Sequence, residues 1–157
     1  MGLDMYLTAE KYLSNWDHAD AENKAAFAKV IEAAGFDIED VPPGSPGVTI
    51  EANVMYWRKA NAIHNWFVQR VQNGIDDCGR YRVTRDHLTL LKEACEEVID
   101  NPNATHEVLP TKSGFFFGGT QYDERYWNDL QETAVRIGKI LNDPKYQKCT
   151  FYYQSSW

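Results

Sequence analysis

The N-terminal stretch alternates apolar and polar residues, which is the pattern of a β-strand with one buried face. Over residues 3–13, Leu3, Met5 and Leu7 occupy alternate positions, and side chains two residues apart point to the same side of a strand. Three further stretches are rich in β-branched and aromatic residues and predict strands: 48–58, 80–83 and 149–153.

Apolar residues recur at spacings of three and four in four other segments, which is the period of an α-helix with one buried stripe. These segments lie between residues 20 and 35, 61 and 74, 84 and 101, and 120 and 144. The residues placed to cap their N-termini are Asp20, Asn61, Thr84 and the pair Thr120 and Asp123. Gly35, Asn73-Gly74, Asn101-Pro102 and Pro144 are placed to end them.

The resulting order is strand, helix, strand, helix, strand, helix, helix, strand. It predicts an α+β fold with a small, mostly antiparallel sheet and three to four helices packed on one side. Residues 1–157 are expected to form a single domain, with residues 14–47 a probable insertion made of a helix and a Pro/Gly-rich loop.

Composition narrows the class of protein. The 157 residues contain 23 acidic and 16 basic side chains, a net charge of -7, which argues against general nucleic-acid binding and against binding to an anionic membrane. The sequence has no signal peptide pattern and no apolar run of membrane-spanning length. Its three cysteines form no disulfide or zinc spacing. We expect reduced thiols and a cytoplasmic protein.

The aromatic fraction is high, at 13%, and one dense cluster of these residues lies at a predicted strand-to-helix junction. Tyr56 and Trp57 are followed by Arg58, Lys59 and, in the first helical turn, His64. The amides of a helix N-terminus and two cations favour an anion, while an aromatic face can stack on a planar group. Ordinary core packing of the tryptophans with a solvated Arg-Lys pair is the alternative interpretation, and it is the more common outcome.

A second junction has a similar character. Phe115, Phe116 and Phe117 are predicted to form a buried strand that runs through Gly118 and Gly119 into a helix start. This geometry suits an anion, although a tight turn with a helix cap explains the same residues. Two such junctions in one small domain favour a shared pocket between them.

Motifs that would define a reaction are missing from the sequence. No P-loop, no Gly-x-Ser-x-Gly elbow and no paired histidine spacing occurs. We therefore predict no catalytic residue, no metal site and no cofactor. Asp4, on the polar side of the first strand, is the single acidic residue that merits attention.

Four distinctive blocks occur along the chain. They are Gly2 to Tyr6, Tyr56 to Lys59 with Asn61, Ile63-His64 and Trp66, Phe115 to Gly118 with Thr120, Tyr122-Asp123 and Asp129-Leu130, and Phe151 to Tyr153 with Ser155 to Trp157. Together these blocks resemble a family of small proteins found in bacteriophages and prophages. The resemblance implies an accessory role in the cytoplasm of an infected bacterium, and it implies no reaction. A phosphoglycerate kinase label attached to some relatives has no support here, because the chain lacks a nucleotide-phosphate loop.

These observations predict an accessory binding protein whose partner is a host protein or a small anionic, nucleotide-like ligand. The alternatives are a small enzyme acting on a phosphorylated or nucleotide-like substrate, with His64 or Asp4 as the acid–base group, and a homo-oligomer held by an exposed aromatic edge. The predicted ligand-binding residues are Asp4, Tyr6, Tyr56, Trp57, Arg58, Lys59, His64, Gly118, Thr120, Tyr122 and Trp157.

Overall fold

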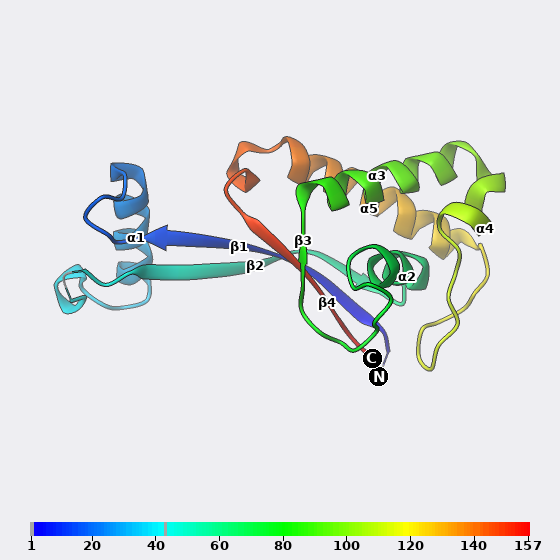
Figure 1. Cartoon of the computed structure of the whole chain (residues 1–157), viewed down its shortest axis with the longest axis horizontal. Helices are drawn as coiled ribbons and strands as arrows, with labels where there is room; N and C mark the ends of the chain where they lie inside the picture. The colour runs from blue at the N-terminus through cyan, green and yellow to red at the C-terminus, as the bar shows by residue number, and fades with distance from the viewer. Residues whose placement is uncertain (1, 43) are drawn as a thin grey trace. The chain divides into compact units, whose positions relative to one another are not determined.

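The computed structural model describes residues 2–42 and 44–157 and has an α+β fold. Four strands, β1 (Asp4–Ser14), β2 (Gly47–Arg58), β3 (Tyr81–Val83) and β4 (Thr150–Ser156), form one antiparallel sheet in the order β2-β1-β4-β3. The first and last long strands are therefore neighbours, and Figure 1 shows the start of β1 beside the end of β4. All four strands were predicted from the sequence.

One face of the sheet is buried and the other is more open. Leu3, immediately before β1, and Met5 and Leu7 on β1 are fully buried, as the alternation predicts, while the residues between them are partly exposed. On β4 the buried positions include Phe151 and Tyr153, which lie opposite residues 83 and 81 of β3. The buried face therefore belongs to the helical side of the domain.

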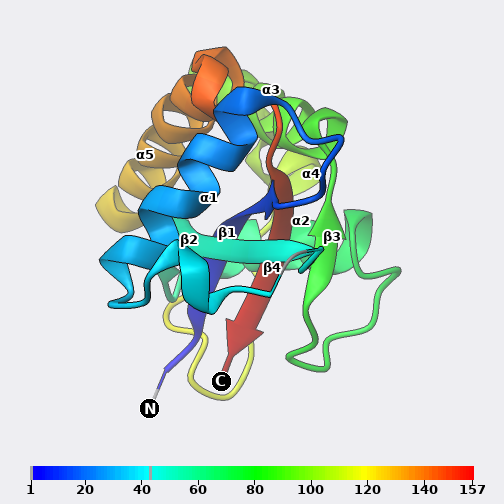
Figure 2. The same ribbon diagram turned by 90° about the vertical axis from the view of Figure 1, so that its left-hand side faces the viewer.

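The described residues form five α-helices. They are α1 (Ala21–Ala33), α2 (Asn61–Arg70), α3 (Arg85–Asp100), the single turn α4 (Thr105–Val108) and α5 (Glu124–Asn142), with short 3₁₀ turns at Ile38–Asp40, Pro102–Ala104 and Pro144–Tyr146. The two longest, α3 and α5, are strongly amphipathic, and they run side by side in both views (Figures 1 and 2). Thr84 and Asp123 cap these two helices through their side chains, as predicted.

Aromatic rings fill the space between α2 and the sheet. The ring of Tyr153 stacks on that of Phe67, with centroids 3.9 Å apart, and Trp57 meets Phe67 edge to face. The indole N–H of Trp57 donates to Thr133 Oγ1 on α5 at 2.7 Å. Part of the aromatic excess is therefore core.

The chain divides into two compact units. The larger unit comprises residues 1–9 and 53–157, and the smaller comprises residues 10–52. The predicted insertion, residues 14–47, falls within the smaller unit. In the described part of the chain, none of the helices has both the length and the apolar character that a membrane crossing requires.

Two local predictions were wrong. Residues 115–117 form a turn rather than a buried strand, and Phe115 is 81% exposed whereas Phe117 is buried. Asn61 is not the N-cap of α2: Ala60 holds that position, and Asn61 is the first helical residue. Phe117 N–H donates to the Gly114 carbonyl within this turn, and the Asn61 side chain bonds to the carbonyl oxygens of Phe117 and Gly119 instead of capping its own helix.

Candidate functional site

A pocket lies where the end of β2, the start of α2, the loop after residue 110 and the first turns of α5 meet. Its empty volume is about 420 Å³, including the part that opens to solvent. The lining residues are Lys59 to Ile63, Thr111, Gly118, Gly119, Gln121, Asp123, Arg125, Tyr126, Asp129 and Leu130. Both junctions singled out in the sequence contribute to it.

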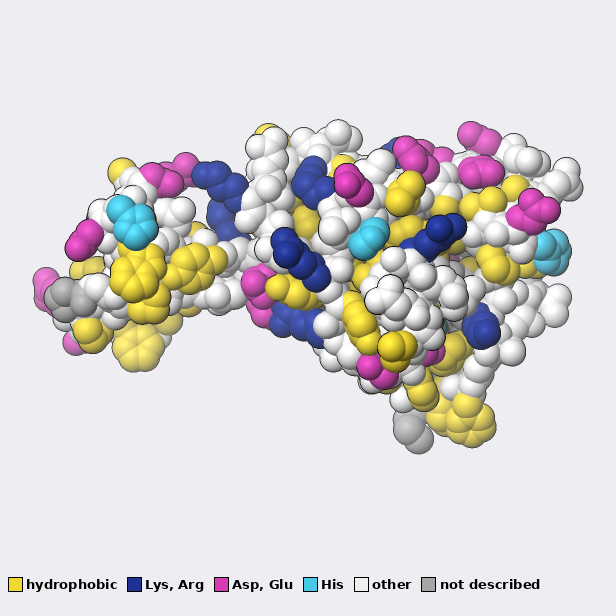
Figure 3. All heavy atoms as spheres, in the orientation of Figure 1, with side chains coloured by type: hydrophobic (Ala, Val, Ile, Leu, Met, Phe, Trp, Pro, Cys, Tyr) yellow, Lys and Arg dark blue, Asp and Glu magenta, His cyan; other side chains and the backbone are white. Residues whose placement is uncertain are grey.

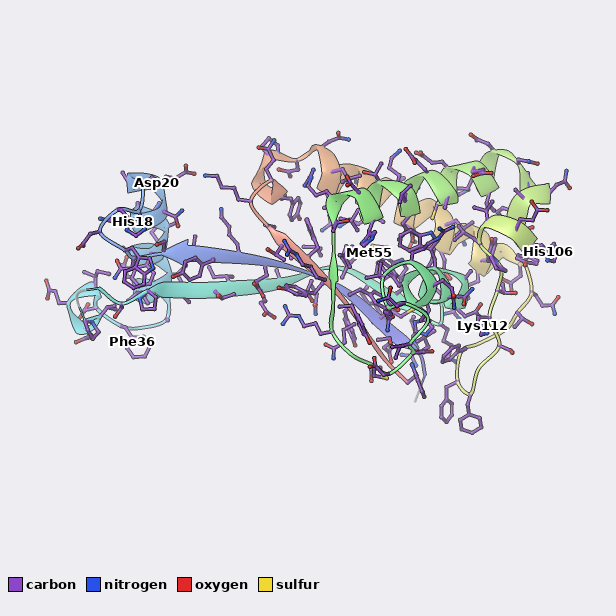
Figure 4. The ribbon with its side chains drawn as sticks, in the orientation of Figure 1. His18, Asp20, Phe36, Met55, His106 and Lys112 are labelled. Atoms are coloured by element: carbon purple, nitrogen blue, oxygen red, sulfur yellow. The ribbon has the colours of Figure 1, made fainter. Side chains whose placement is uncertain are left out.

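Asn61 holds one wall of this pocket in place. Its side-chain amide donates to the carbonyl oxygens of Phe117 and Gly119 at 3.2 and 2.8 Å, and its Oδ1 accepts from the backbone N–H of Lys112 at 3.0 Å. The side chain is buried, and buried amides of this kind fix the backbone they bond to. Asn61 thus ties the start of α2 to both arms of the loop on which Figure 4 labels Lys112.

Gly118 in the loop lies very close to Lys59, the residue that follows β2. Gly118 has a φ of +88°, and a Cβ placed on it would lie 3.1 Å from Cβ of Lys59. Lys59 itself has a φ of 59°, an unusual value for a residue other than glycine. The main chain around it is held because Lys59 N–H donates to the Leu3 carbonyl at 2.7 Å and Leu3 N–H donates to Phe116 O at 3.2 Å.

Several positively charged groups contribute to the lining of the pocket. Lys59 and Arg125 both line it, and the Arg125 guanidinium donates a 2.5 Å hydrogen bond to the Arg58 carbonyl. The first residues of α2 also line the pocket, and no side chain caps that helix. The amides of a helix N-terminus lack intrahelical acceptors and carry a partial positive charge, so three positive elements converge here.

Two carboxyl groups, Asp123 and Asp129, share the lining with these cations. Burial raises the pKa of Asp129 to about 6, an effect that Arg125 opposes and that Glu132 and Asp123 reinforce. Asp129 therefore changes its charge close to neutral pH. Above pH 6 the pocket holds two cations against two anions, and below it the cations dominate.

Of the predicted ligand-binding residues, Lys59 and Gly118 line this pocket, while four others lie together on the open face of the sheet. Tyr56 donates to Asp4 Oδ1 at 2.5 Å, and its ring lies 5.4 Å from that of Tyr6. The hydrogen bond to Asp4 raises the pKa of Tyr56, and the nearby Arg58 opposes that rise. This group is exposed on a surface, so it is separate from the pocket.

Trp57 and His64, also predicted to face a ligand, lie in the core. The two ring nitrogens of His64 are both engaged, Nδ1 with the Tyr153 hydroxyl at 2.7 Å and Nε2 with Asp76 Oδ2 at 3.0 Å. Trp157, the last predicted residue, donates its indole N–H to Asp76 Oδ1 at 3.1 Å. The result is a continuous chain of hydrogen bonds that runs from the buried Tyr153 and His64 through the partly exposed Asp76 to the exposed Trp157.

Thr120 and Tyr122 belong to the loop that leads into α5. The Thr120 carbonyl accepts from Thr111 Oγ1 at 3.0 Å, so the residue closes the loop and does not cap α5. The Tyr122 hydroxyl lies 3.1 Å from Nδ1 of His106, and its ring meets that of Tyr126 edge to face. Both residues therefore support the segment next to the pocket.

The sequence reasoning missed three residues that define this pocket: Asn61 as an anchor, Arg125 as a cation and Asp129 as a titrating acid. A signal for the last two exists, since Arg125 and Asp129 are four residues apart and flank the apolar stripe at Tyr126 and Leu130. Asn61 carried no such signal, because its partners are backbone atoms of a distant loop.

The described residues contain no group of three or more His, Cys, Asp or Glu side chains arranged to hold a metal ion. Comparison with protein-family models, with curated proteins and with solved structures finds no match to this chain. The geometry of the pocket is therefore the feature that points to a function.

Proposed function

We propose that this protein binds a small anionic ligand of the nucleotide-like class, through a phosphate or carboxylate group, in the pocket between β2, α2 and α5. The observation that carries the proposal is the convergence of Lys59, Arg125 and the uncapped N-terminus of α2 on one hollow. Arginine and lysine supply charge-assisted hydrogen bonds to such groups, and helix amides add neutral donors.

The groups that would bind the ligand are also held in position by contacts within the protein. Asn61 fixes the loop wall, Arg125 is positioned by the Arg58 carbonyl, and the close approach of Gly118 places the Lys59 backbone. Pre-positioned donors avoid much of the entropic cost of ordering side chains on binding. A binding role fits this arrangement.

Isothermal titration calorimetry with inorganic phosphate, AMP and ATP tests the proposal. We expect at least one of these anions to bind, and we expect Lys59→Met and Arg125→Gln each to weaken that binding by about tenfold or more. Lys139→Gln removes the same charge from the exposed far end of α5 and serves as the control. The proposal fails if none of these anions binds, or if the pocket variants bind as tightly as the control.

A second candidate is an enzyme that acts on a phosphorylated or nucleotide-like substrate in the same pocket. One observation favours it: the pKa of Asp129, raised to about 6, lets this carboxyl group exchange a proton near neutral pH. His64 and Asp4, the acid–base groups expected from the sequence, are absent from the pocket lining. A turnover assay on phosphate esters separates the two candidates, because Asp129→Asn would abolish turnover but preserve binding.

The cellular setting is part of the same proposal. The sequence blocks that resemble phage and prophage proteins support an accessory protein acting in the cytoplasm of an infected bacterium. Several of these blocks contact one another, since Leu3 bonds to both Lys59 and Phe116, and the ring centroids of Phe117 and Trp157 lie 5.9 Å apart.

A further inference from the structure

The smaller unit, residues 10–52, carries most of the net charge of the protein. It contains nine acidic and three basic residues, a net charge of -6, while the rest of the chain has 14 acidic and 13 basic residues, a net charge of -1. The unit is therefore strongly anionic, and the larger unit is close to neutral.

The same unit leaves an unusual share of its apolar side chains in solvent. Among its described residues, Leu13 and Phe27 are the large apolar side chains that are buried. Five large apolar side chains are exposed instead: Tyr12, Trp16, Phe36, Ile38 and Ile50. Phe36 is the most exposed of them, at 59%, and Figure 3 shows hydrophobic side chains gathered on this face of the unit, near the residues labelled His18 and Phe36 in Figure 4.

The backbone that carries these side chains is held by its own hydrogen bonds. Asn15 N–H donates to the Pro46 carbonyl at 3.1 Å, and Ser14 N–H donates to Asn23 Oδ1 at 2.9 Å. The Trp16 ring stacks on that of His18, with centroids 6.4 Å apart. The exposed rings are thus presented by a defined segment, and contiguous exposed apolar groups on such a segment are typical of interaction sites.

The net charge of the smaller unit indicates which kind of molecule would bind this surface. A second copy would bring another unit of charge -6, which repels the first, or a larger unit that is nearly neutral. Nucleic acid is repelled for the same reason. A protein surface with lysine or arginine around apolar side chains matches both the charge and the exposed rings.

We infer that residues 10–52 form a docking surface for another protein, whose contact surface is cationic and apolar. The anionic residues accelerate encounter with the partner, and the exposed aromatic side chains supply the buried contacts. This surface is independent of the anion pocket, to which none of its residues contributes.

Fluorescence anisotropy with a labelled amphipathic peptide of leucine and lysine tests the inference on the full-length protein. We expect this peptide to bind, and we expect the double variant Trp16→Ser/Phe36→Ser to weaken binding about tenfold or more. The control Phe115→Ser/Val135→Ser removes two exposed apolar side chains of the larger unit and should change the affinity less than about twofold. All four side chains are exposed, so circular dichroism should show each variant folded.

Two further peptides and one further measurement can overturn the inference. A leucine–glutamate peptide that binds as tightly as the leucine–lysine peptide would remove the role of charge, and a lysine–serine peptide that binds as tightly would remove the role of the apolar side chains. Light scattering that shows a concentration-dependent dimer, abolished by Trp16→Ser/Phe36→Ser, would assign the surface to a second copy. Failure of the leucine–lysine peptide to bind also refutes it, and Lys59→Met should leave peptide binding unchanged.

Discussion

The hydroxyl oxygen of Tyr153 lies 2.7 Å from Nδ1 of His64, and both side chains are buried. Asp76 holds the other ring nitrogen of His64, so the imidazole is fixed at both ends. A histidine placed in this way links α2 to β4 within the core. Only 1% of His64 is exposed, and both of its ring nitrogens have partners within the protein.

Removing the phenol oxygen should therefore destabilise the fold. Tyr153→Phe keeps the ring stacked on Phe67 but leaves Nδ1 of His64 buried without its partner. An unsatisfied buried polar group costs about 1–3 kcal/mol, and urea denaturation should show a loss of this size. Tyr152→Phe, on the opposite, partly exposed face of β4, is the matched control and should change stability little. Equal effects of the two variants would contradict the role given to His64.

The Asn61 side chain gives a second prediction, on local order. Asn61→Ala removes three hydrogen bonds to the loop formed by residues 112–119, so the backbone N–H of Lys112 loses its acceptor. We expect hydrogen exchange at this amide to accelerate, together with weaker anion binding, because one wall of the pocket is no longer fixed. Asn65→Ala, on the same helix, should leave exchange at Lys112 unchanged. Unchanged exchange in Asn61→Ala would show that the loop is held by other contacts.

The two adjacent glycines of the loop allow a sharper comparison. Gly118→Ala places a side chain at a φ of +88° and 3.1 Å from Lys59 Cβ, whereas a Cβ on Gly119 meets nothing within 4 Å. We expect Gly118→Ala to cost about 1–2 kcal/mol of stability, while Gly119→Ala stays within about 0.5 kcal/mol of the parent. Thermal unfolding of the two variants measures the difference. A larger loss for Gly119→Ala would contradict this account of the loop.

The elements of the fold could be predicted from the sequence because their signals are local. The alternation at Leu3, Met5 and Leu7 and the caps at Thr84 and Asp123 each act within a few residues. The prediction of a buried strand over Phe115 to Phe117 was wrong, because composition alone cannot show that the chain turns there. The backbone of that turn bonds to Asn61, which lies more than fifty residues earlier, and to Leu3 at the other end of the chain.

The candidate site was predicted only in part, for a related reason. Lys59 and Gly118 were identified from the chemistry of two helix junctions, and the structure places both on one pocket. Trp57 was included for its polar neighbours, yet its indole N–H finds a partner in Thr133 inside the core. The N–H or O–H group of a buried aromatic side chain can form its hydrogen bond with a core residue far away in the sequence. The sequence does not show which residue that is.

The raised pKa of Asp129 gives a prediction for ligand affinity. Sulfate keeps its charge of two between pH 4.5 and 8, so any pH dependence of its binding belongs to the protein. Protonation of Asp129 removes a negative charge from the pocket, so affinity should rise by about tenfold as pH falls through about 6. Calorimetry with the Asp129→Asn variant is the control, because its affinity should be high and nearly constant across this range. A parent protein whose sulfate affinity does not change with pH would contradict the assignment.

The same group should make stability depend on pH, with a sign that follows from its burial. The pKa of Asp129 is about 6 in the folded protein and near its ordinary value of 3.8 in the unfolded chain, so between these values the folded state binds more protons. Its contribution to stability is therefore present at low pH and is lost as pH rises from about 4 to 6. Asp129→Asn removes that loss, and the variant should be more stable than the parent by about 1–2 kcal/mol above pH 6, with the difference vanishing below pH 4. Urea denaturation of both proteins from pH 4 to 8 measures this difference. A variant that is less stable than the parent at pH 7 would show that the ionised carboxylate is stabilised by Arg125 more than it is penalised by burial.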